Sequence, residues 1–328
     1  MTSPTDLTAA ALLDAYRARS LSPVETAEAC LARIEALDGA YNAFCHVDAE
    51  TTLEQARASE RRWFAGAPSG LLDGVPVAVK DVFLTAGWPT LRGSRTVPPE
   101  GPWELDAPVI AALRRHGAVL VGKTTTPEIG WKAVTDSPLH GVTTNPWDPG
   151  RTAGGSSGGS SAALAARMAP LALGTDGGGS IRIPCSFCNL AGIKPTYGRV
   201  PLWPASPFGT LAHAGPMSRT VTDTALLLTV LAEPDARDWT ALPPDRRDYR
   251  NDLDGGVAGL RVAYSPALGG AAADPAVRSV TDAAAQTFAE LGAHVEQADP
   301  GVPDPLETFT ALWYAGAANA LRHLDDGE

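Results

Sequence analysis

Apolar residues recur at helical spacing in the first part of the chain. The positions of the first clear repeat are Val24, Ala27, Leu31, Ile34 and Leu37. This spacing puts them on one face and predicts an amphipathic helix over 23–38. Ser22-Pro23-Val24-Glu25 supplies an N-cap, a proline at the first helical position and a glutamate for a capping box, so the helix begins there. We expect an extended segment at 43–47 and a second helix near 49–65.

Short apolar runs between helical stretches predict buried strands. Residues 71–82 read LLDGVPVAVKDV, and the valines in this run favour a buried strand. Asp106 is expected to cap a helix that ends at Gly117, and a strand over 118–121 follows. The alternation of helices and strands indicates a layered α/β protein whose helices cover a sheet.

The same alternation continues around a polar connection in the last part of the chain. Residues 233–256 are rich in proline, aspartate and arginine, so we expect a surface connection, with a subdomain seam as one interpretation. The elements expected around it are helix 221–232, strand 260–264, helix 274–291, strand 293–296 and helix 306–324. We see no internal repeat.

Composition and charge narrow the class of partner. The chain has 328 residues, 44% hydrophobic and 19% charged, an ordinary balance for a globular protein with a sizeable core. Its net charge of −11 argues against a broad nucleic-acid or anionic-membrane surface, because either would need clustered lysine and arginine. No segment approaches the ~20 apolar residues of a membrane span. We expect a cytoplasmic protein that acts on a small molecule. The sequence leaves open whether it forms a homodimer.

The cysteines and histidines predict neither a disulfide framework nor a metal site. Four cysteines are too few for a framework in a chain this long. Cys185 and Cys188 have the CxxC spacing, but there is no second pair and Pro184 precedes them, so two packed thiols are the better interpretation. The six histidines lack metal-ligand spacing. We expect no metal and no cofactor.

Lys80 is the first candidate for chemistry. It follows three apolar residues near the end of the predicted strand, where the sheet and its covering layers would exclude water from the ammonium group. Burial disfavours the charged form, so the pKa of Lys80 could fall toward ~7–8, the range of a general base. The alternative is an ion pair with Asp81 or another carboxylate.

Two clusters of glycine and serine supply the other candidates. They are Gly154-Gly155-Ser156-Ser157-Gly158-Gly159-Ser160 and Thr175-Asp176-Gly177-Gly178-Gly179-Ser180. The Ser180 hydroxyl and the N–H groups of Gly177, Gly178, Gly179 and Ser180 could converge on one carbonyl as a nucleophile with an oxyanion hole. The alternative for this fragment is a glycine turn that ends in a polar residue.

These clusters belong to a longer set of segments that resembles the amidase signature family. The similar segments are 74–81, 145–149, 154–160, 174–184, 192–200 and 215–221. The resemblance covers most of the chain and implies a three-layer α/β/α fold, in which helices flank a central twisted mixed β-sheet. It also implies an amidase that hydrolyses a carboxylic amide to a carboxylate and ammonia or an amine, with esterase side activity open.

The resemblance implies a single domain over 1–328. Helices in 1–70 would pack on the core, 71–232 would form the catalytic core, and 257–328 would begin an incomplete C-terminal part. Family members generally continue past the last residue of this chain. A truncated, inactive family member is therefore one alternative.

The resemblance also implies a Ser-cis-Ser-Lys triad. Ser180 is the expected nucleophile, Ser156 the relay on a cis peptide with Gly155, and Lys80 the base. Residues expected to support the nucleophile loop are Thr175, Asp176, Arg182 and Ser157. Residues that could line an apolar acyl pocket, or could equally be ordinary packing, are Trp131, Leu202, Trp203 and Phe208. The acyl preference stays open among aryl, aliphatic and peptide amides.

Other interpretations of the glycine and serine clusters fit less well. Gly154-x-Ser156-x-Gly158 matches a nucleophile elbow, but an elbow needs a strand before it, and the prolines in 145–153 predict a loop. The histidines available to an elbow mechanism are His213, His294 and His323. No lysine follows the glycine run, which excludes a phosphate-binding P-loop.

The main rival within the resembling family is the glutamine-hydrolysing component of a tRNA-dependent amidotransferase, an amidase that passes ammonia to a partner. That component usually has glutamine where this chain has Ile183. The acidic composition also suits a free-standing amidase better.

Overall fold

A computed structural model describes residues 3–244, 246–268, 273–322 and 324. The chain divides into two compact units. The main unit comprises Met1–Arg250 and Gly316–Glu328, and the small unit comprises Asn251–Ala315. The first boundary falls inside the polar connection expected over 233–256.

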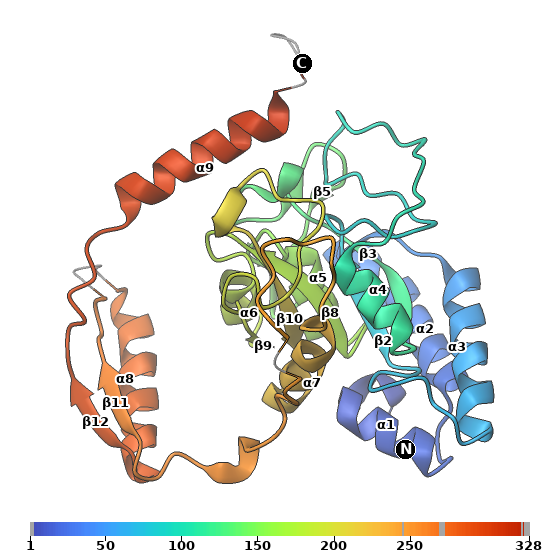
Figure 1. The fold of residues 1–328 in the computed structure, drawn as a ribbon, viewed down its shortest axis with the longest axis horizontal. Coiled ribbons are helices and arrows are strands. Elements are labelled where there is room, and N and C mark those ends of the chain that lie inside the picture. The colour runs from blue at the N-terminus through green and yellow to red at the C-terminus, as the bar shows by residue number, and fades with distance from the viewer. Residues whose placement is uncertain (1–2, 245, 269–272, 323, 325–328) are drawn as a thin grey trace. The chain divides into compact units, whose positions relative to one another are not determined.

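Figure 1 follows the elements in chain order. The α-helices are α1 (Ala9–Arg17), α2 (Pro23–Tyr41), α3 (Ala49–Phe64), α4 (Pro108–Arg115), α5 (Gly158–Ala165), α6 (Arg182–Phe187), α7 (Val221–Leu231), α8 (Pro275–Glu290) and α9 (Leu306–Leu321). The strands are β1 (Phe44–His46), β2 (Pro76–Lys80), β3 (Val119–Thr124), β4 (Asp136–Ser137), β5 (Gly141–Val142), β6 (Thr144–Asn145), β7 (Asp148–Thr152), β8 (Leu171–Asp176), β9 (Ala191–Gly192), β10 (His213–Ser218), β11 (Arg261–Tyr264) and β12 (His294–Gln297). Short 3-10 helices are η1 (Pro4–Asp6), η2 (Glu128–Gly130), η3 (Gly209–Leu211) and η4 (Leu253–Gly255).

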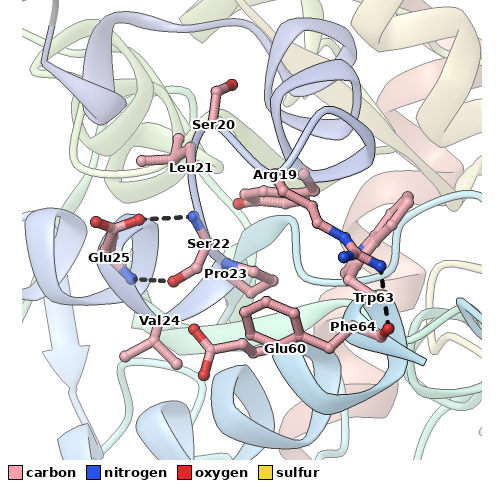
Figure 2. A pocket seen from close by; sticks show the side chains of 11 residues that line it. Arg19, Ser20, Leu21, Ser22, Pro23, Val24, Glu25, Glu60, Trp63 and Phe64 are labelled. Carbon is pink, nitrogen blue, oxygen red and sulfur yellow. Dashed lines mark hydrogen bonds between the residues drawn. The ribbon is translucent and has the colours of Figure 1, made fainter. Parts of the chain in front are cut away.

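The start of α2 confirms the predicted capping box. The Ser22 side chain accepts a hydrogen bond from the Glu25 N–H at 3.2 Å, and the Glu25 carboxylate accepts one from the Ser22 N–H at 2.7 Å (Figure 2). These two bonds satisfy N–H groups that a helix start would otherwise leave without partners. Within the described ranges, no helix has both the length and the apolar content needed to cross a bilayer.

Six strands of the main unit form one mixed sheet in the order β1-β3-β2-β8-β10-β9. β2 runs parallel to both β3 and β8, whereas β1, β10 and β9 are antiparallel to their neighbours. Parallel strands end at the same edge of a sheet, so the residues that follow β2 and β8 lie near one another. Lys80 ends β2 and Asp176 ends β8.

Each face of the sheet has its own core, which gives the expected α/β/α layers. Val77 and Val79 pack in a first core with residues of α1, α4 and α7, whereas Ala78 packs in a second core with residues of α2, α5 and α6. Lys80 faces the second core because alternate residues of a strand share a face. A register shift pairs Lys123 with Val79, so Lys123 faces the first core.

The described residues of the small unit form two strands, the helix between them, the short η4 helix and the first part of α9, up to Ala315. β11 and β12 pair in parallel, and α8 lies between them in the sequence. The Asp274 side chain caps α8 by accepting from the Ala276 N–H at 2.8 Å. Among the apolar residues that the structure describes in this unit, only Ala293 is buried. These few elements thus leave the small unit with little core of its own.

The prediction that Asp106 caps the next helix is wrong. Ala107 occupies the N-cap position of α4, and proline begins the helix at Pro108. The Asp106 carboxylate instead accepts from the Ala86 N–H at 2.8 Å and from Arg114 Nε at 2.9 Å. Proline at the first position needs no N–H partner, so the helix can begin without a side-chain cap.

The prediction of a loop over 145–153 is also wrong. β6 and β7 form an antiparallel hairpin there, in a two-stranded sheet of its own. β7 is mostly exposed, and its proline lies at an edge where no ladder partner is needed.

Candidate active site

Lys80 is fully buried and its amine meets three hydroxyl groups. The Nζ atom lies 2.6 Å from Ser156 Oγ, 2.7 Å from Thr175 Oγ1 and 3.0 Å from Ser157 Oγ. The two serines precede α5, and the threonine lies in β8 beside β2. The fold therefore brings the predicted base, the predicted relay and two predicted supporting residues to one point.

Burial lowers the pKa of Lys80 to about 7, and the negative charge of Asp176 opposes part of that shift. The cause is that the ammonium form has lost its water, and three hydroxyls provide no counter-charge. At neutral pH a large fraction of the amine is therefore uncharged.

Asp81 follows Lys80 in the sequence but pairs with a different lysine. Its Oδ1 atom lies 3.0 Å from Lys123 Nζ, and both side chains are almost fully buried. Neighbouring residues of an extended segment point to opposite faces, which separates Asp81 from the amine of Lys80. The alternative interpretation, an ion pair between Lys80 and Asp81, is therefore wrong.

Ser156 lies in the loop that leads into α5, and the Gly155–Ser156 peptide bond is cis. A Cβ atom at Gly155 would lie 2.7 Å from the backbone nitrogen of Val134. Only glycine lets the two segments approach so closely. The glycine that precedes Ser156 thus has a packing role as well as a position in the motif.

Asp176 holds the loop that carries Ser180. Its carboxylate accepts from the N–H groups of Gly179 at 2.8 Å and Ile181 at 3.2 Å. Arg182 donates to both carboxylate oxygens, at 2.9 Å through Nε and at 2.8 Å through Nη2. Burial alone would raise the pKa of Asp176, but the hydrogen bonds and charge of Arg182, with the N–H groups, lower it overall. An ionised carboxylate at the start of the glycine run therefore holds the end of that run and the first residues after Ser180.

The structure removes Gly179 from the predicted oxyanion hole. Its N–H already donates to Asp176, because that carboxylate lies under the turn. The N–H groups of Gly177, Gly178 and Ser180 donate to none of the residues that the structure describes. These three groups remain candidate donors to a ligand.

Ser180 is 7% exposed, and its backbone is hydrogen-bonded to Ser157, one of the residues that contact the Lys80 amine. The Ser180 carbonyl accepts from the Ser157 N–H at 3.3 Å. In the described part of the chain, the Ser180 hydroxyl has no hydrogen-bond partner, and it does not reach Ser156. The structure thus joins Lys80 to Ser156 but leaves the second hydroxyl contact of the predicted relay open.

Leu202 and Trp203 line a cavity of about 640 Å³ in the main unit, whereas Trp131 and Phe208 do not. Its other aromatic side chains are Tyr197, His213 and Trp239. His213 pairs with Asp176 across β10 and β8, which places the cavity beside the strand end that leads into the Ser180 loop. The structure thus separates the predicted pocket residues.

A second cavity, of about 440 Å³, lies among α1, α2 and α3 (Figure 2). Arg19 lies over the ring of Phe64, with 5.8 Å between its guanidinium carbon and the ring centroid, and donates to the Phe64 carbonyl at 3.2 Å. None of the predicted site residues lines this cavity.

One group in the described ranges has the atoms of a metal site. Cys45, Asp81 and His140 place possible ligand atoms within 4.8 Å of one another. The ammonium group of Lys123 already lies beside Asp81 and would repel a cation. Burial also raises the pKa of the Cys45 thiol well above its usual value, so the group lacks a thiolate. These residues suit a buried ion pair better than a metal.

Sequence reasoning missed Lys123 and Gly130. Lys123 lies in an apolar strand, and this chain has few lysines, so the signal that marked Lys80 was present there too. Gly130 has a φ of +72°, and a Cβ atom there would lie 3.5 Å from Ser156 Oγ. No local pattern marked Gly130, because its importance depends on a contact between distant segments.

Comparisons with known proteins place these observations in context. A family model described as Amidase matches residues 25–327. The A subunit of glutamyl-tRNA(Gln) amidotransferase from Chloroflexus aurantiacus is 42% identical over 327 residues, 99% of this chain and 67% of the relative. An acylamidase from Rhodococcus erythropolis is 40% identical over 321 residues, 97% of this chain and 67% of the relative. The chain thus spans about two thirds of the length of these relatives.

Solved structures agree in fold. A bacterial aryl acylamidase of the amidase signature enzymes superposes with a TM-score of 0.87 at 32% identity, over 98% of this chain and 69% of that one. A 6-aminohexanoate cyclic dimer hydrolase also superposes with a TM-score of 0.87, at 31% identity, over 99% of this chain and 69% of the other.

Proposed function

The chain belongs to the amidase signature family of hydrolases that act on amide C–N bonds, and we propose that it cleaves a small carboxylic amide through an acyl-enzyme. In this proposal Ser180 is the nucleophile, Ser156 the relay and Lys80 the base. One observation carries it: a buried amine contacts three hydroxyl groups, and burial lowers its pKa to about 7.

The hydrogen bonds around Lys80 support a direction for the proton. A neutral amine has two N–H donors and one lone pair, so its three hydroxyl neighbours cannot all accept. The Ser157 hydroxyl donates to the Thr175 carbonyl at 3.3 Å, which leaves its oxygen to accept from Lys80. Ser156 is the nearest neighbour and donates to no other described group. We assign the lone pair of Lys80 to the proton of Ser156.

The first half of the reaction forms the acyl-enzyme. As Ser180 Oγ attacks the carbonyl carbon, its proton moves to Ser156 and the Ser156 proton moves to Lys80. The carbonyl oxygen becomes an oxyanion, to which the N–H groups of Gly177, Gly178 and Ser180 would donate. When the C–N bond breaks, the protons return along the same path to the leaving nitrogen.

The second half releases the product. Water attacks the acyl carbon and gives one proton to the relay, from which Ser180 regains its hydrogen. The acyl group is released as a carboxylate, and one of its oxygens comes from that water. The open contact between the hydroxyls of Ser156 and Ser180 is compatible with this path, because catalytic hydrogen bonds often tighten only when substrate binds.

We place the acyl group against apolar side chains near the Ser180 loop. The cavity beside that loop is lined by Trp203, and Trp131 directly follows Gly130, which lies near Ser156. An apolar or aryl acyl group would fit such walls.

A second candidate function is that of the glutamine-hydrolysing component of a tRNA-dependent amidotransferase. It is favoured by the 42% identity to relatives that carry that name. Ile183 stands where that component usually has glutamine, which favours a free-standing amidase. Hydrolysis of glutamine, compared with aryl, aliphatic and peptide amides in one panel, separates the two candidates.

The proposal is tested by labelling and by hydrolysis with the full chain. A fluorophosphonate probe should modify Ser180, as identified by mass spectrometry of the digested protein. Ser180→Ala should abolish labelling and slow amide hydrolysis by a factor on the order of 10⁶, because the nucleophile is gone. Ser186→Ala is the matched control, since Ser186 is exposed on α6 and should behave as wild type.

Two results would contradict the proposal. One is labelling of a different residue in the wild-type chain. The other is a Ser180→Ala variant that hydrolyses amides at the wild-type rate. An absence of both labelling and hydrolysis in wild type would favour a non-catalytic protein.

A further inference from the structure

A buried ion pair lies on the face of the sheet opposite Lys80. Lys123 Nζ lies 3.0 Å from Asp81 Oδ1, 2.7 Å from Thr90 Oγ1 and 3.0 Å from the Phe83 carbonyl. Lys123 follows the β2–β3 register shift, and Asp81 directly follows Lys80. The pair therefore fixes the chain at the point where it leaves the candidate catalytic strand.

The second oxygen of Asp81 holds a strained turn. Asp81 Oδ2 accepts from the Arg92 N–H at 2.8 Å, and the Arg92 carbonyl accepts from the Ile129 N–H at 2.8 Å. Arg92 has a φ of +56° and Ile129 a φ of +47°. Non-glycine residues adopt this left-handed conformation only where their surroundings hold them. Two hydrogen bonds in series thus connect Asp81 to Ile129.

The segment that begins at Ile129 reaches the relay serine. Its neighbour Gly130 lies near Ser156, since a Cβ atom added at Gly130 would lie 3.5 Å from Ser156 Oγ, an ordinary contact distance. A few residues on, the Val134 backbone leaves no room for a side chain at Gly155. The segment 129–134 therefore packs tightly against Gly155 and runs close to Ser156, the two residues of the cis peptide.

We propose that Asp81 and Lys123 are positioning residues that hold segment 129–134 against Ser156. They do not touch the reacting atoms, and the inference rests on the proposed function of Ser156 and Ser180. The ion pair fixes Arg92, Arg92 fixes Ile129, and the backbone that continues to Val134 then fixes Gly155, the residue before Ser156. Loss of the carboxylate should release the segment and slow acylation of Ser180.

The chain offers a matched control for the loss of a buried carboxylate. Asp73 is fully buried and pairs with Arg62, whose Nε lies 2.8 Å from Asp73 Oδ2. It precedes β2, at the end of that strand opposite Lys80. Asp73→Asn should therefore perturb stability as Asp81→Asn does, without reaching Ser156.

The experiment compares wild type, Asp81→Asn and Asp73→Asn at a temperature where each is folded. The rate of Ser180 labelling by a fluorophosphonate is measured per folded molecule, and hydrogen exchange is followed in peptides that cover 126–134. Asp81→Asn should slow labelling about tenfold to a hundredfold, as small displacements of a catalytic group do. It should also speed exchange at Ile129. Asp73→Asn should leave both close to wild type.

A double variant keeps the test decisive if Asp81→Asn does not fold. Asp81→Leu with Lys123→Met removes both charges, so no buried charge is left without a partner, and such replacements are often tolerated. It still removes the acceptor for the Arg92 N–H. Slow labelling with fast exchange would support the proposal.

The outcomes separate this inference from the proposed function. Wild-type chain that is not labelled at Ser180 would overturn both. Normal labelling of wild type, with an equal rate in a folded Asp81 variant, would overturn only the positioning role. Equal slowing in Asp73→Asn would overturn it as well, because the effect would then follow stability alone.

Discussion

Lys80 and Lys123 lie on neighbouring parallel strands and are both fully buried, yet they face opposite sides of the sheet. The amine of Lys80 meets three hydroxyls, whereas that of Lys123 meets a carboxylate, a hydroxyl and backbone carbonyls. Burial lowers the pKa of each, but at Lys123 a carboxylate 3.0 Å away acts against burial.

The difference shows that burial alone does not make a lysine a base. Removing water disfavours the ammonium form at both positions, and the partner decides how much of that effect remains. At Lys123 the carboxylate of Asp81 favours the ammonium form and acts against burial. Hydroxyls can exchange protons with an amine but cannot neutralise its charge, which is the environment a general base needs.

The largest expected effect comes from removing the amine of Lys80. Lys80→Met should lower amide hydrolysis by about 10²- to 10⁴-fold, the usual contribution of a general base. Steady-state kinetics with a reactive amide measures this loss. Arg17→Met is the control, because Arg17 is exposed on α1 and pairs with Asp14 at the surface. An unchanged rate in Lys80→Met would remove the distinction between the two buried lysines.

The two lysines should also differ in what they contribute to stability. Lys123→Met leaves Asp81 buried without its cation and should lower the free energy of unfolding by about 3–5 kcal/mol. Lys80→Met removes a group whose pKa falls from 10.5 to about 7 on folding. Below pH 7 the folded wild type contains a buried ammonium group, which lowers its free energy of unfolding. Lys80→Met should therefore be more stable than wild type there.

The sign of the Lys80 effect can be followed with pH. Between pH 7 and 10.5 the unfolded chain binds a proton that the folded chain has lost, so wild-type stability rises through this window. The advantage of Lys80→Met should therefore shrink as pH rises. Denaturant melts at pH 6 and pH 9 measure it. A Lys123→Met variant as stable as Lys80→Met would contradict the comparison.

The smallest effect is the pH dependence of the wild-type rate. If neutral Lys80 is the base, hydrolysis should rise about tenfold from pH 6 to pH 8, because the pKa of the amine is about 7. A pH profile of kcat/KM measures the rise. An inflection near the ordinary lysine value would instead show that Lys80 stays charged at neutral pH.

Elements that depend on neighbouring residues were predictable from the sequence. The capping box at Ser22 and Glu25 formed as expected, and the run before Lys80 became a buried strand. The contact between Lys80 and Ser156 spans 76 positions in the sequence, and no local period predicts it. It followed from the resemblance of several segments to one family.

Features set by contacts between distant segments were not predictable. The register shift between β2 and β3 turns Lys123 to the face opposite Lys80, and nothing in either strand alone encodes it. The N–H of Gly179 was expected to face a substrate, but a carboxylate at the end of β8 accepts its hydrogen bond. Aspartate is a common helix-capping residue, yet the Asp106 carboxylate accepts hydrogen bonds from Ala86 and Arg114 instead.

The four cysteines allow local unfolding of this chain to be followed through their chemical reactivity. None forms a disulfide, and Cys30, Cys185 and Cys188 are buried, with Cys45 half-buried. Burial raises the pKa of Cys30 and Cys185 to about 12 and raises that of the other two thiols. Because only thiolates react with disulfide reagents, the native thiols are nearly inert at pH 8. The rate of thiol modification therefore measures how often the chain opens from its native state, and no dye has to be added.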